Sequence, residues 1–162
     1  MPAHGVDQFA AAGVQTLRVG RVAGSGEPGF GGDGGQATIA ELNGPGGVVA
    51  GSDGSIYVAD TLNHRIRRIA VDGTIHTIAG TGEACEEGTN DDPGAPPPTC
   101  GENVPALLAR LHSPTALAIG PDGTLYLVDP VLGCVRAISS SARSGLWPEF
   151  AVRRFLVAAA RV

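Results

Sequence analysis

The chain has 162 residues, of which 43% are hydrophobic and 17% charged, and it contains 25 glycines and 12 prolines. This composition excludes long helices and wholesale disorder, and it favours short strands joined by many turns. The net charge is −5 and every basic residue is an arginine, which argues against a nucleic-acid partner because phosphate binding needs a clustered basic face. No apolar run approaches the ~20 residues that a membrane span requires, so no membrane role is expected.

Residues 1–15 are predicted to form a disordered leader, which lacks the basic start and long apolar core of a signal peptide. Residues 16–23 are predicted to form the outer strand of a preceding unit. Residues 24–41 then form an insertion. Within it, Gly24–Gly29 matches the G-x-G-x-x-G pattern, but no helix follows to receive a pyrophosphate, so nucleotide binding is not expected.

The most informative feature of the sequence is a segment that occurs twice. Leu42–Ile69 and Leu111–Ile138 align without a gap at an offset of 69 residues. Internal repetition of this kind indicates a fold assembled from similar units. The positions that are identical in the two copies are Leu42/Leu111, Pro45/Pro114, Gly51/Gly120, Asp53/Asp122, Gly54/Gly123, Tyr57/Tyr126, Asp60/Asp129, Arg67/Arg136 and Ile69/Ile138.

Residues 42–80 contain one complete unit, with strands predicted at 46–50, 56–60, 65–70 and 74–79. Asp-Gly pairs between alternating apolar runs predict tight hairpin turns, because glycine accepts a positive φ. Four short antiparallel strands in roughly 40 residues are typical of a propeller blade. We therefore predict an all-β fold over residues 16–139, an incomplete β-propeller built from four-stranded antiparallel blades. The predicted turn residues are Asp53, Gly54, Asp72, Gly73, Asp122 and Gly123.

Residues 81–110 form a second, longer insertion that is rich in acidic residues and proline. Cys85 and Cys100 bracket its acidic part, and two interpretations stay open: a disulfide formed in an oxidising compartment, or two free thiols. Calcium binding by the acidic side chains is disfavoured, because no EF-hand or RTX spacing is present, and solvated loop charge is the preferred interpretation. The acidic side chains in question are Glu86, Glu87, Asp91 and Asp92.

Residues 111–139 predict only three strands, so this last blade is expected to be incomplete. The divergent tail at 140–162 has no Asp-Gly turn and contains the only tryptophan, Trp147. Two interpretations of the tail stay open: a truncated or frame-shifted product, or a helix over Glu149–Val162. Closed propellers have 4 to 8 blades, so the remaining blades or self-association are expected to complete the assembly.

One rim of the predicted blades is the candidate binding site. Antiparallel alternation sends the Asp-Gly turns to one rim, and it sends the loops at 61–64 and 131–134 with both insertions to the other. Long connections gathered on one face commonly carry binding residues. The side chains expected to contribute are Thr61, Leu62, Asn63, His64 and His112.

The first copy resembles an NHL repeat in the segment GDGGQATIAELNGPGGVVAGSDGSIYVADTLNHRIRRI, including the leading GFGGDGG of bacterial NHL proteins and teneurin-like segments. The resemblance implies a propeller that serves mainly as a binding platform, and a bacterial source. It also implies that Arg65, opposite Asp60, makes a charge-assisted hydrogen bond that closes the loop between them. The weaker second copy has Leu132 and Cys134 at the corresponding positions, so we expect it to lack this lock.

These observations predict a non-enzymatic binding or interaction module, part of a larger propeller, whose partner is a protein or another ligand at the loop rim. No catalytic residue, metal site or cofactor is predicted, because His4, His64, His76 and His112 lack metal-ligand spacing and no G-x-S-x-G elbow is present. Two alternatives stay open: a fragment of a propeller lyase or hydrolase with a central-channel site, and a truncated product without independent function. An extracellular or cell-envelope location is expected for the parent protein.

Overall fold

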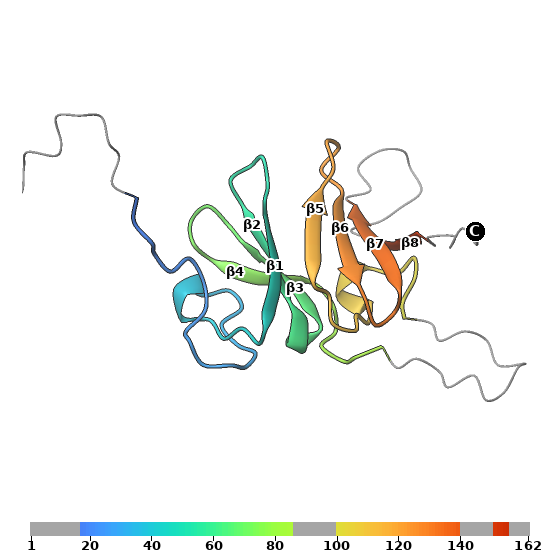
Figure 1. Cartoon of the computed structure of the whole chain (residues 1–162), viewed down its shortest axis with the longest axis horizontal. Helices are drawn as coiled ribbons and strands as arrows, with labels where there is room; N and C mark the ends of the chain where they lie inside the picture. The colour runs from blue at the N-terminus through green and yellow to red at the C-terminus, as the bar shows by residue number, and fades with distance from the viewer. Residues whose placement is uncertain (1–16, 86–99, 140–150, 156–162) are drawn as a thin grey trace, which may run out of the picture.

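The computed structural model describes residues 17–85, 100–139 and 151–155. These residues form two four-stranded antiparallel sheets, each with its strands in chain order, and three short 3-10 turns (Figure 1). The first sheet consists of β1 (Pro45–Ala50), β2 (Ile56–Asp60), β3 (Arg65–Ile69) and β4 (Ile75–Ala79). The second sheet consists of β5 (Ala116–Ile119), β6 (Leu125–Asp129), β7 (Cys134–Ser139) and β8 (Ala151–Phe155). The 3-10 turns are η2 (Ala37–Ile39), η3 (Thr61–Asn63) and η4 (Ala106–Leu108).

The first sheet confirms the four strands predicted for residues 42–80. Its hairpin turns place Gly54 at φ +81° and Gly73 at φ +86°, a region that side chains with a Cβ rarely occupy. The aspartate before each glycine fastens its turn: Asp53 accepts a hydrogen bond from the Ser55 amide at 3.0 Å. Short polar side chains of this kind stabilise turns by bonding the backbone two residues ahead.

The second sheet differs from the sequence-based prediction at its outer edge. β8 pairs antiparallel with β7, from Ser139 opposite Ala151 to Val135 opposite Phe155. The predicted three-stranded blade is therefore a four-stranded sheet, and the helix considered for Glu149–Val162 is wrong over 151–155. The unpaired backbone groups along β7 need a partner, and an extended segment satisfies them whatever its side chains are.

The predicted outer strand at 16–23 is also wrong, because residues 17–23 form no strand in the structure (Figure 1). Leu17 and Val19 are almost fully exposed. A strand needs a neighbouring strand for its backbone hydrogen bonds. Residues 17–23 pair with no strand among the described residues.

The two sheets pack side by side and share an apolar core. Ile66 and Ala79 of the first sheet are buried against Leu111 and Leu127 of the second unit. β1 runs so close to β5 that a side chain at Gly47 would collide with the backbone of the second unit. Two adjoining sheets with this topology are consistent with propeller blades, although residues 17–85, 100–139 and 151–155 do not form a closed ring.

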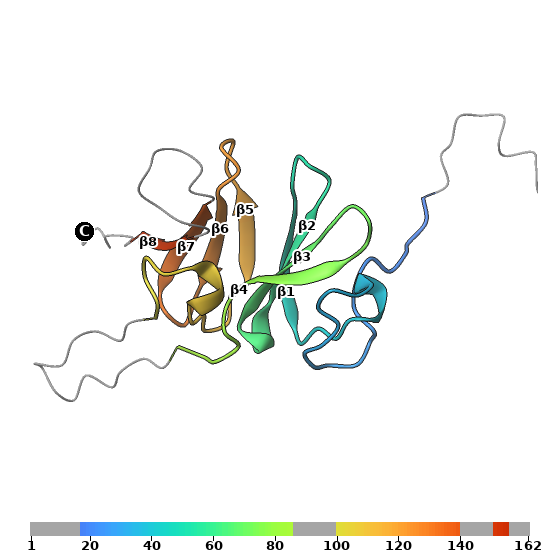
Figure 2. The ribbon, with the colours of Figure 1, turned by 180° about the vertical axis from the view of Figure 1, so that it is seen from behind.

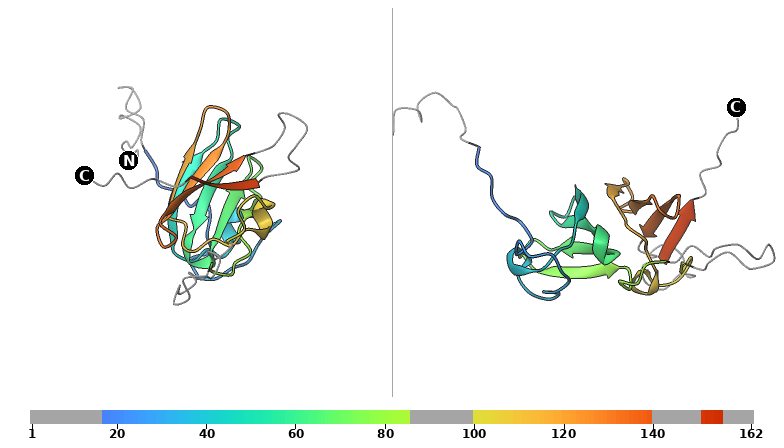
Figure 3. Two further views of the ribbon diagram at one scale, coloured as in Figure 1. Left: turned by 90° about the vertical axis from the view of Figure 1, so that its right-hand side faces the viewer. Right: turned by 60° about the horizontal axis from the view of Figure 1, so that its bottom comes forward.

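The connections between strands divide between two rims, as predicted from strand alternation. The Asp-Gly hairpins point to the top of Figure 1, whereas η3, η4 and the described ends of the second insertion lie toward the bottom. Figure 2 shows the same division from behind, and in the right-hand view of Figure 3 the lower rim comes forward. Both insertions were predicted to lie at the rim opposite the Asp-Gly turns. Part of the first insertion lies elsewhere, because Gln36 forms a β-bridge with Thr74, which directly follows the Asp72-Gly73 turn.

Candidate functional site

The candidate site is the rim opposite the Asp-Gly hairpins, formed by residues 24–32, 61–64, 80–85 and 106–113; we call it the insertion rim (Figure 1). All five side chains selected from the sequence lie on it. They do not have equal access to solvent, however, and several of them are fastened to other parts of the chain.

His64 and His112 meet where the two sheets join. Their rings are stacked, with centroids 5.7 Å apart and planes 8° apart. His64 reaches this position because it ends η3 in the left-handed conformation, at φ 53°. Burial lowers the pKa of His64 below its ordinary value, and the charges of His112 and Arg65 act in the same direction, while Asp129 opposes them. The uncharged form of His64 is therefore favoured.

Thr61 and Asn63 are structural members of the rim. The Thr61 hydroxyl donates a hydrogen bond to the Pro114 carbonyl at 2.6 Å, which ties η3 to the second unit. The Asn63 amide donates to the Gly29 carbonyl at 2.7 Å and to Asp60 Oδ2 at 2.8 Å. Both side chains thus donate hydrogen bonds within the protein.

Asp60 is bound by Arg67, and not by Arg65 as the sequence suggested. Arg67 Nη1 lies 3.2 Å from Asp60 Oδ2, and both side chains are fully buried. The other guanidinium nitrogen lies 2.7 Å from Asp33 of the first insertion. A buried charge pair requires such additional partners to offset its desolvation. The expected Asp60–Arg65 lock is corrected to an Asp60–Arg67–Asp33 network.

Arg65 makes different contacts, although it lies opposite Asp60 in the strand register. Its guanidinium lies 3.7 Å from the centre of the Phe30 ring and donates to the Thr81 carbonyl at 2.6 Å. Stacking on an aromatic face suits the planar, weakly hydrated guanidinium. Arg65 therefore joins the first insertion to the start of the second.

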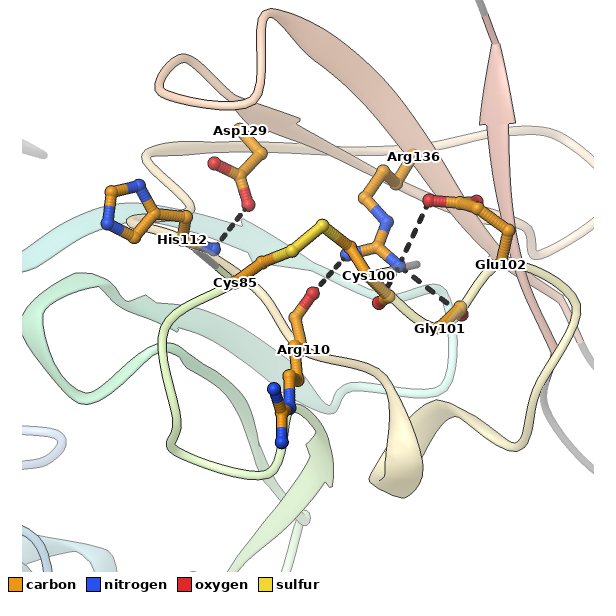
Figure 4. The surroundings of a disulfide bond; sticks show 8 residues. All are labelled: Cys85, Cys100, Gly101, Glu102, Arg110, His112, Asp129 and Arg136. Carbon is orange, nitrogen blue, oxygen red and sulfur yellow. Dashed lines mark hydrogen bonds and ion pairs between the residues drawn. A yellow bond between two sulfur atoms is a disulfide. The ribbon is translucent and has the colours of Figure 1, made fainter. Parts of the chain in front are cut away.

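The second copy repeats the buried arginine with other partners (Figure 4). Arg136 donates to the carbonyls of Arg110 at 2.6 Å and Cys100 at 3.0 Å, and it lies 3.3 Å from Glu102. In the first copy, Arg67 makes the corresponding contacts with the Glu41 and Gly31 carbonyls and with Asp33. The sequence analysis missed this correspondence, although ATIAEL at 37–42 and ALLARL at 106–111 already keep the offset of the repeat.

Cys85 and Cys100 form the disulfide that was one of the two predicted alternatives (Figure 4). The bond fixes Cys100, whose carbonyl accepts a hydrogen bond from buried Arg136. The disulfide thereby supports the core of the second unit as well as the loop between the two cysteines. The acidic residues Glu86, Glu87, Asp91 and Asp92 lie outside the described residues.

Asp129 occupies the place of Asp60 but is less completely bonded. Its Oδ2 accepts the backbone amide of His112 at 2.7 Å, as Asp60 accepts that of Asn43. Its Oδ1 is buried without a hydrogen-bond partner among the described residues. The second copy carries Leu132 where Asn63 supplies an amide in the first, which explains the difference.

Three of the side chains that the rim presents to solvent are leucines. Leu62 of η3 is 57% exposed, and Leu107 and Leu108 of η4 are 54% and 64% exposed. Leu62 was selected from the sequence, whereas the two leucines of η4 were not. A sequence alone does not distinguish them from core leucines, because a 3-10 turn has too few residues to show a periodicity.

Within residues 17–85 and 100–139, no group of three or more His, Cys, Asp or Glu side chains is placed to hold a metal ion. None of the helical segments described is long and apolar enough to cross a membrane. Neither observation identifies the ligand of the rim.

Residues 19–87 match the sequence model of the teneurin NHL domain. This part of the chain is therefore similar to the NHL domain of teneurins. The chain is 38% identical over 99 residues both to teneurin-3 of Danio rerio and to teneurin-4 of Mus musculus, and these alignments cover 60% of the chain. The chain spans only 3% of the length of these relatives.

The chain is also similar to proteins other than teneurins. A chloroplastic protein of Arabidopsis thaliana, SUPPRESSOR OF QUENCHING 1, is 32% identical over 110 residues, covering 67% of the chain and 9% of the relative. A crystal structure from Bacteroides thetaiotaomicron, provisionally named a phosphatase, has a TM-score of 0.52 at 22% identity and covers 76% of this chain and 26% of that one. That likeness concerns the fold alone. The teneurin relatives come from animals, so the expectation of a bacterial source finds no support.

Proposed function

We propose that this chain is a non-enzymatic interaction module, part of a larger NHL propeller, that binds a protein through the insertion rim. The observation that carries the proposal is the exposure of Leu62, Leu107 and Leu108 on η3 and η4. These turns lie beside the junction where His64 stacks on His112. Exposed aliphatic side chains on a rigid frame favour a protein partner, because burying them releases ordered water.

The insertion rim is suited to rigid binding because hydrogen bonds hold η3 to the rest of the protein. Thr61 holds η3 to the second unit through the Pro114 carbonyl, and Asn63 holds it to the first insertion through the Gly29 carbonyl. A surface whose backbone is fixed before binding loses less conformational entropy when the partner arrives. The lyase or hydrolase alternative rests on fold-level likeness, and no observation among the described residues favours it.

Affinity capture with quantitative mass spectrometry tests the proposal. We compare the unaltered chain with a Leu62→Ser, Leu108→Ser double variant and with Val71→Ser. Val71 is the matched control, because it is 75% exposed beside the hairpin turn on the opposite rim. We expect a partner that is retained by the unaltered chain and by Val71→Ser, and at least about 10-fold less by the double variant. Capture that is insensitive to the rim substitutions would overturn the proposal.

The compartment is a separate part of the proposal. Disulfides persist mainly in oxidising environments, so the Cys85–Cys100 bond supports an extracellular or cell-envelope location for the parent protein. Thiol alkylation of the protein in intact cells, followed by mass spectrometry, tests this. Unmodified Cys85 and Cys100 are expected, and full alkylation of both would contradict the location.

A further inference from the structure

The first unit has an uncovered hollow where the second unit is covered. A cavity of about 290 Å³ lies at the start of the first insertion. Its lining residues are Arg21, Ala23, Gly24, Gly26, Glu27, Pro28, Leu42 and Pro45. Leu42 is half-buried and Pro45 exposed, whereas their equivalents Leu111 and Pro114 are completely buried. The same position of the repeat is therefore open in one copy and closed in the other.

The backbone around the two positions follows the same path. The sequence AGSGE at 23–27 corresponds to AGTGE at 79–83. Gly24 N donates to the Ala37 carbonyl at 2.9 Å, as Gly80 N donates to that of Ala106 at 3.0 Å. The next amide, of Ser25 or Thr81, makes an equivalent bond to the Ala40 or Ala109 carbonyl. The second copy thus shows what fits the hollow of the first.

In the second copy, the occupant is the loop between β2 and β3 of the preceding sheet. Thr61 donates its hydroxyl to the Pro114 carbonyl at 2.6 Å. Arg65 passes over Gly82 and donates to the Thr81 carbonyl at 2.6 Å. A Cβ at Gly82 would collide with the Arg65 guanidinium, so glycine is required for this passage.

In the first copy, a neighbouring side chain substitutes for that arginine. Arg21 Nη1 donates to the Ser25 carbonyl at 2.8 Å, the equivalent of the Thr81 carbonyl that Arg65 reaches. The Arg21 guanidinium also lies beside Gly26, the equivalent of Gly82. A backbone carbonyl followed by a glycine therefore binds a guanidinium group in both copies. In the first copy these are Ser25 and Gly26, and the guanidinium comes from Arg21 in the adjacent exposed segment.

We propose that the hollow bounded by Ser25, Gly26 and Pro45 is the docking seat for a further NHL repeat, whose loop carries a threonine and an arginine at the positions of Thr61 and Arg65. This rests on the second half of the proposed function, that the chain is part of a larger propeller. A second copy of this chain fits less well as the occupant. Its Thr61 loop is already engaged, and its other loop has Pro130 and Cys134 in place of the two donors.

A chain with one added repeat tests the seat. Residues 24–79 are duplicated between Ala23 and Gly24, so that the added Ala79 leads directly into the original Gly24. We expect a single thermal unfolding transition with a midpoint at least about 4 °C above that of the original chain, because the added sheet buries the seat. Unchanged stability or two separate transitions would overturn the proposal.

Substitutions in the added repeat identify the contacts. Thr61→Val with Arg65→Met in the added copy removes both donors, and we expect it to abolish about half of the gain or more. Val71→Ser in the added copy is the matched control, because this exposed position lies at the opposite rim, and it should keep the gain. Equal midpoints for the two variants would show that the seat does not select these side chains.

Gly26→Val at the original seat supplies a second check. The strain of placing valine at φ +105° is present in both chains, so only the difference between them reports docking. We expect a larger loss of midpoint temperature in the extended chain. Sedimentation of the original chain tests whether a second copy of the chain occupies the seat. A dimer that is abolished by Gly26→Val would assign the seat to that second copy and overturn the proposal. None of these measurements uses the partner of the insertion rim, so either proposal can fail without the other.

Discussion

The two units of this protein support an equivalent buried arginine by different means. In the first, Arg67 lies between two carboxylates, Asp60 and Asp33, and Phe30 lies nearby with its ring centre 5.0 Å from the guanidinium. In the second, Arg136 has Glu102 and three backbone carbonyls, one of which belongs to disulfide-bonded Cys100. The buried cation and one carboxylate partner are kept, while the second unit has a disulfide where the first has an aromatic ring.

The difference is concentrated at one place in the repeat. Gly29 and Gly31 flank Phe30 in the first copy, and Cys85 and Cys100 stand at the equivalent positions in the second. Arg65, which stacks on Phe30, is replaced by buried Cys134. An aromatic contact and a disulfide can therefore serve the same purpose, which is to hold the insertion carbonyl that receives the arginine.

Substitution of each arginine by methionine should give the largest effect and separates the two units. Arg67→Met leaves Asp60 buried without its cation, and the expected loss in free energy of unfolding is about 3–5 kcal/mol. Arg136→Met should cost less, because Glu102 is 29% exposed and can be hydrated. Urea unfolding of both variants measures the difference. An equal or larger loss for Arg136→Met would contradict this comparison.

Removal of the disulfide should come next in size. The cysteines are 15 residues apart, and the Cys85→Ser, Cys100→Ser variant is expected to lose about 3 kcal/mol of unfolding free energy. Hydrogen exchange gives the local signature: amides of β7 should lose protection before those of β3, because Arg136 depends on Cys100 and Arg67 does not. Equal loss of protection in both strands would show that the bond is not specific to the second unit.

A smaller change, an increase in the free energy of unfolding, is expected when the second copy receives an asparagine equivalent to Asn63. Leu132→Asn should place a donor near Asp129 Oδ1, as Asn63 does for Asp60 at 2.8 Å, and raise the unfolding free energy by about 1 kcal/mol. Leu132→Ala is the control, because it removes the leucine without supplying an amide. If both variants are destabilised alike, the missing hydrogen bond to Asp129 Oδ1 does not limit the stability of this loop.

The smallest effect concerns pH at the junction between the units. Since the pKa of His64 is lowered in the folded state, the unfolded chain binds more protons, and stability falls as the pH drops through the ordinary histidine range near 6.5. Thermal unfolding at pH 7.5 and 5.5 should show the lower midpoint at pH 5.5. His64→Gln should reduce this difference, and His76→Gln, at an exposed position of β4, is the control substitution. A pH dependence that is the same in all three proteins would contradict the assignment to His64.

The sequence by itself determined the repeat unit, the strands of the first sheet, the hairpin turns and the separation of the two rims. These follow from local rules: apolar alternation selects strands, and Asp-Gly pairs accept the conformation of tight turns. The two cysteines could also be paired in principle, because they bracket a loop whose ends must meet. The sequence left the choice between a disulfide and free thiols open.

The tertiary structure alone decided which arginine binds Asp60. Arg65 and Arg67 lie on the same face of β3, so the register allows either one. Phe30 and the Thr81 carbonyl draw Arg65 away, and Asp33 places Arg67 between two carboxylates. These groups come from distant parts of the chain, and a burial cost that only several partners together can offset selects the arrangement.

Tertiary contacts also decided whether strands form in residues 17–23 and 151–155. Residues 151–155 form β8 by pairing with β7, whereas residues 17–23, despite a strand-like pattern, pair with no strand among the described residues. A strand is completed by its neighbour's hydrogen bonds, and whether a neighbour is present is not encoded in the strand's own residues.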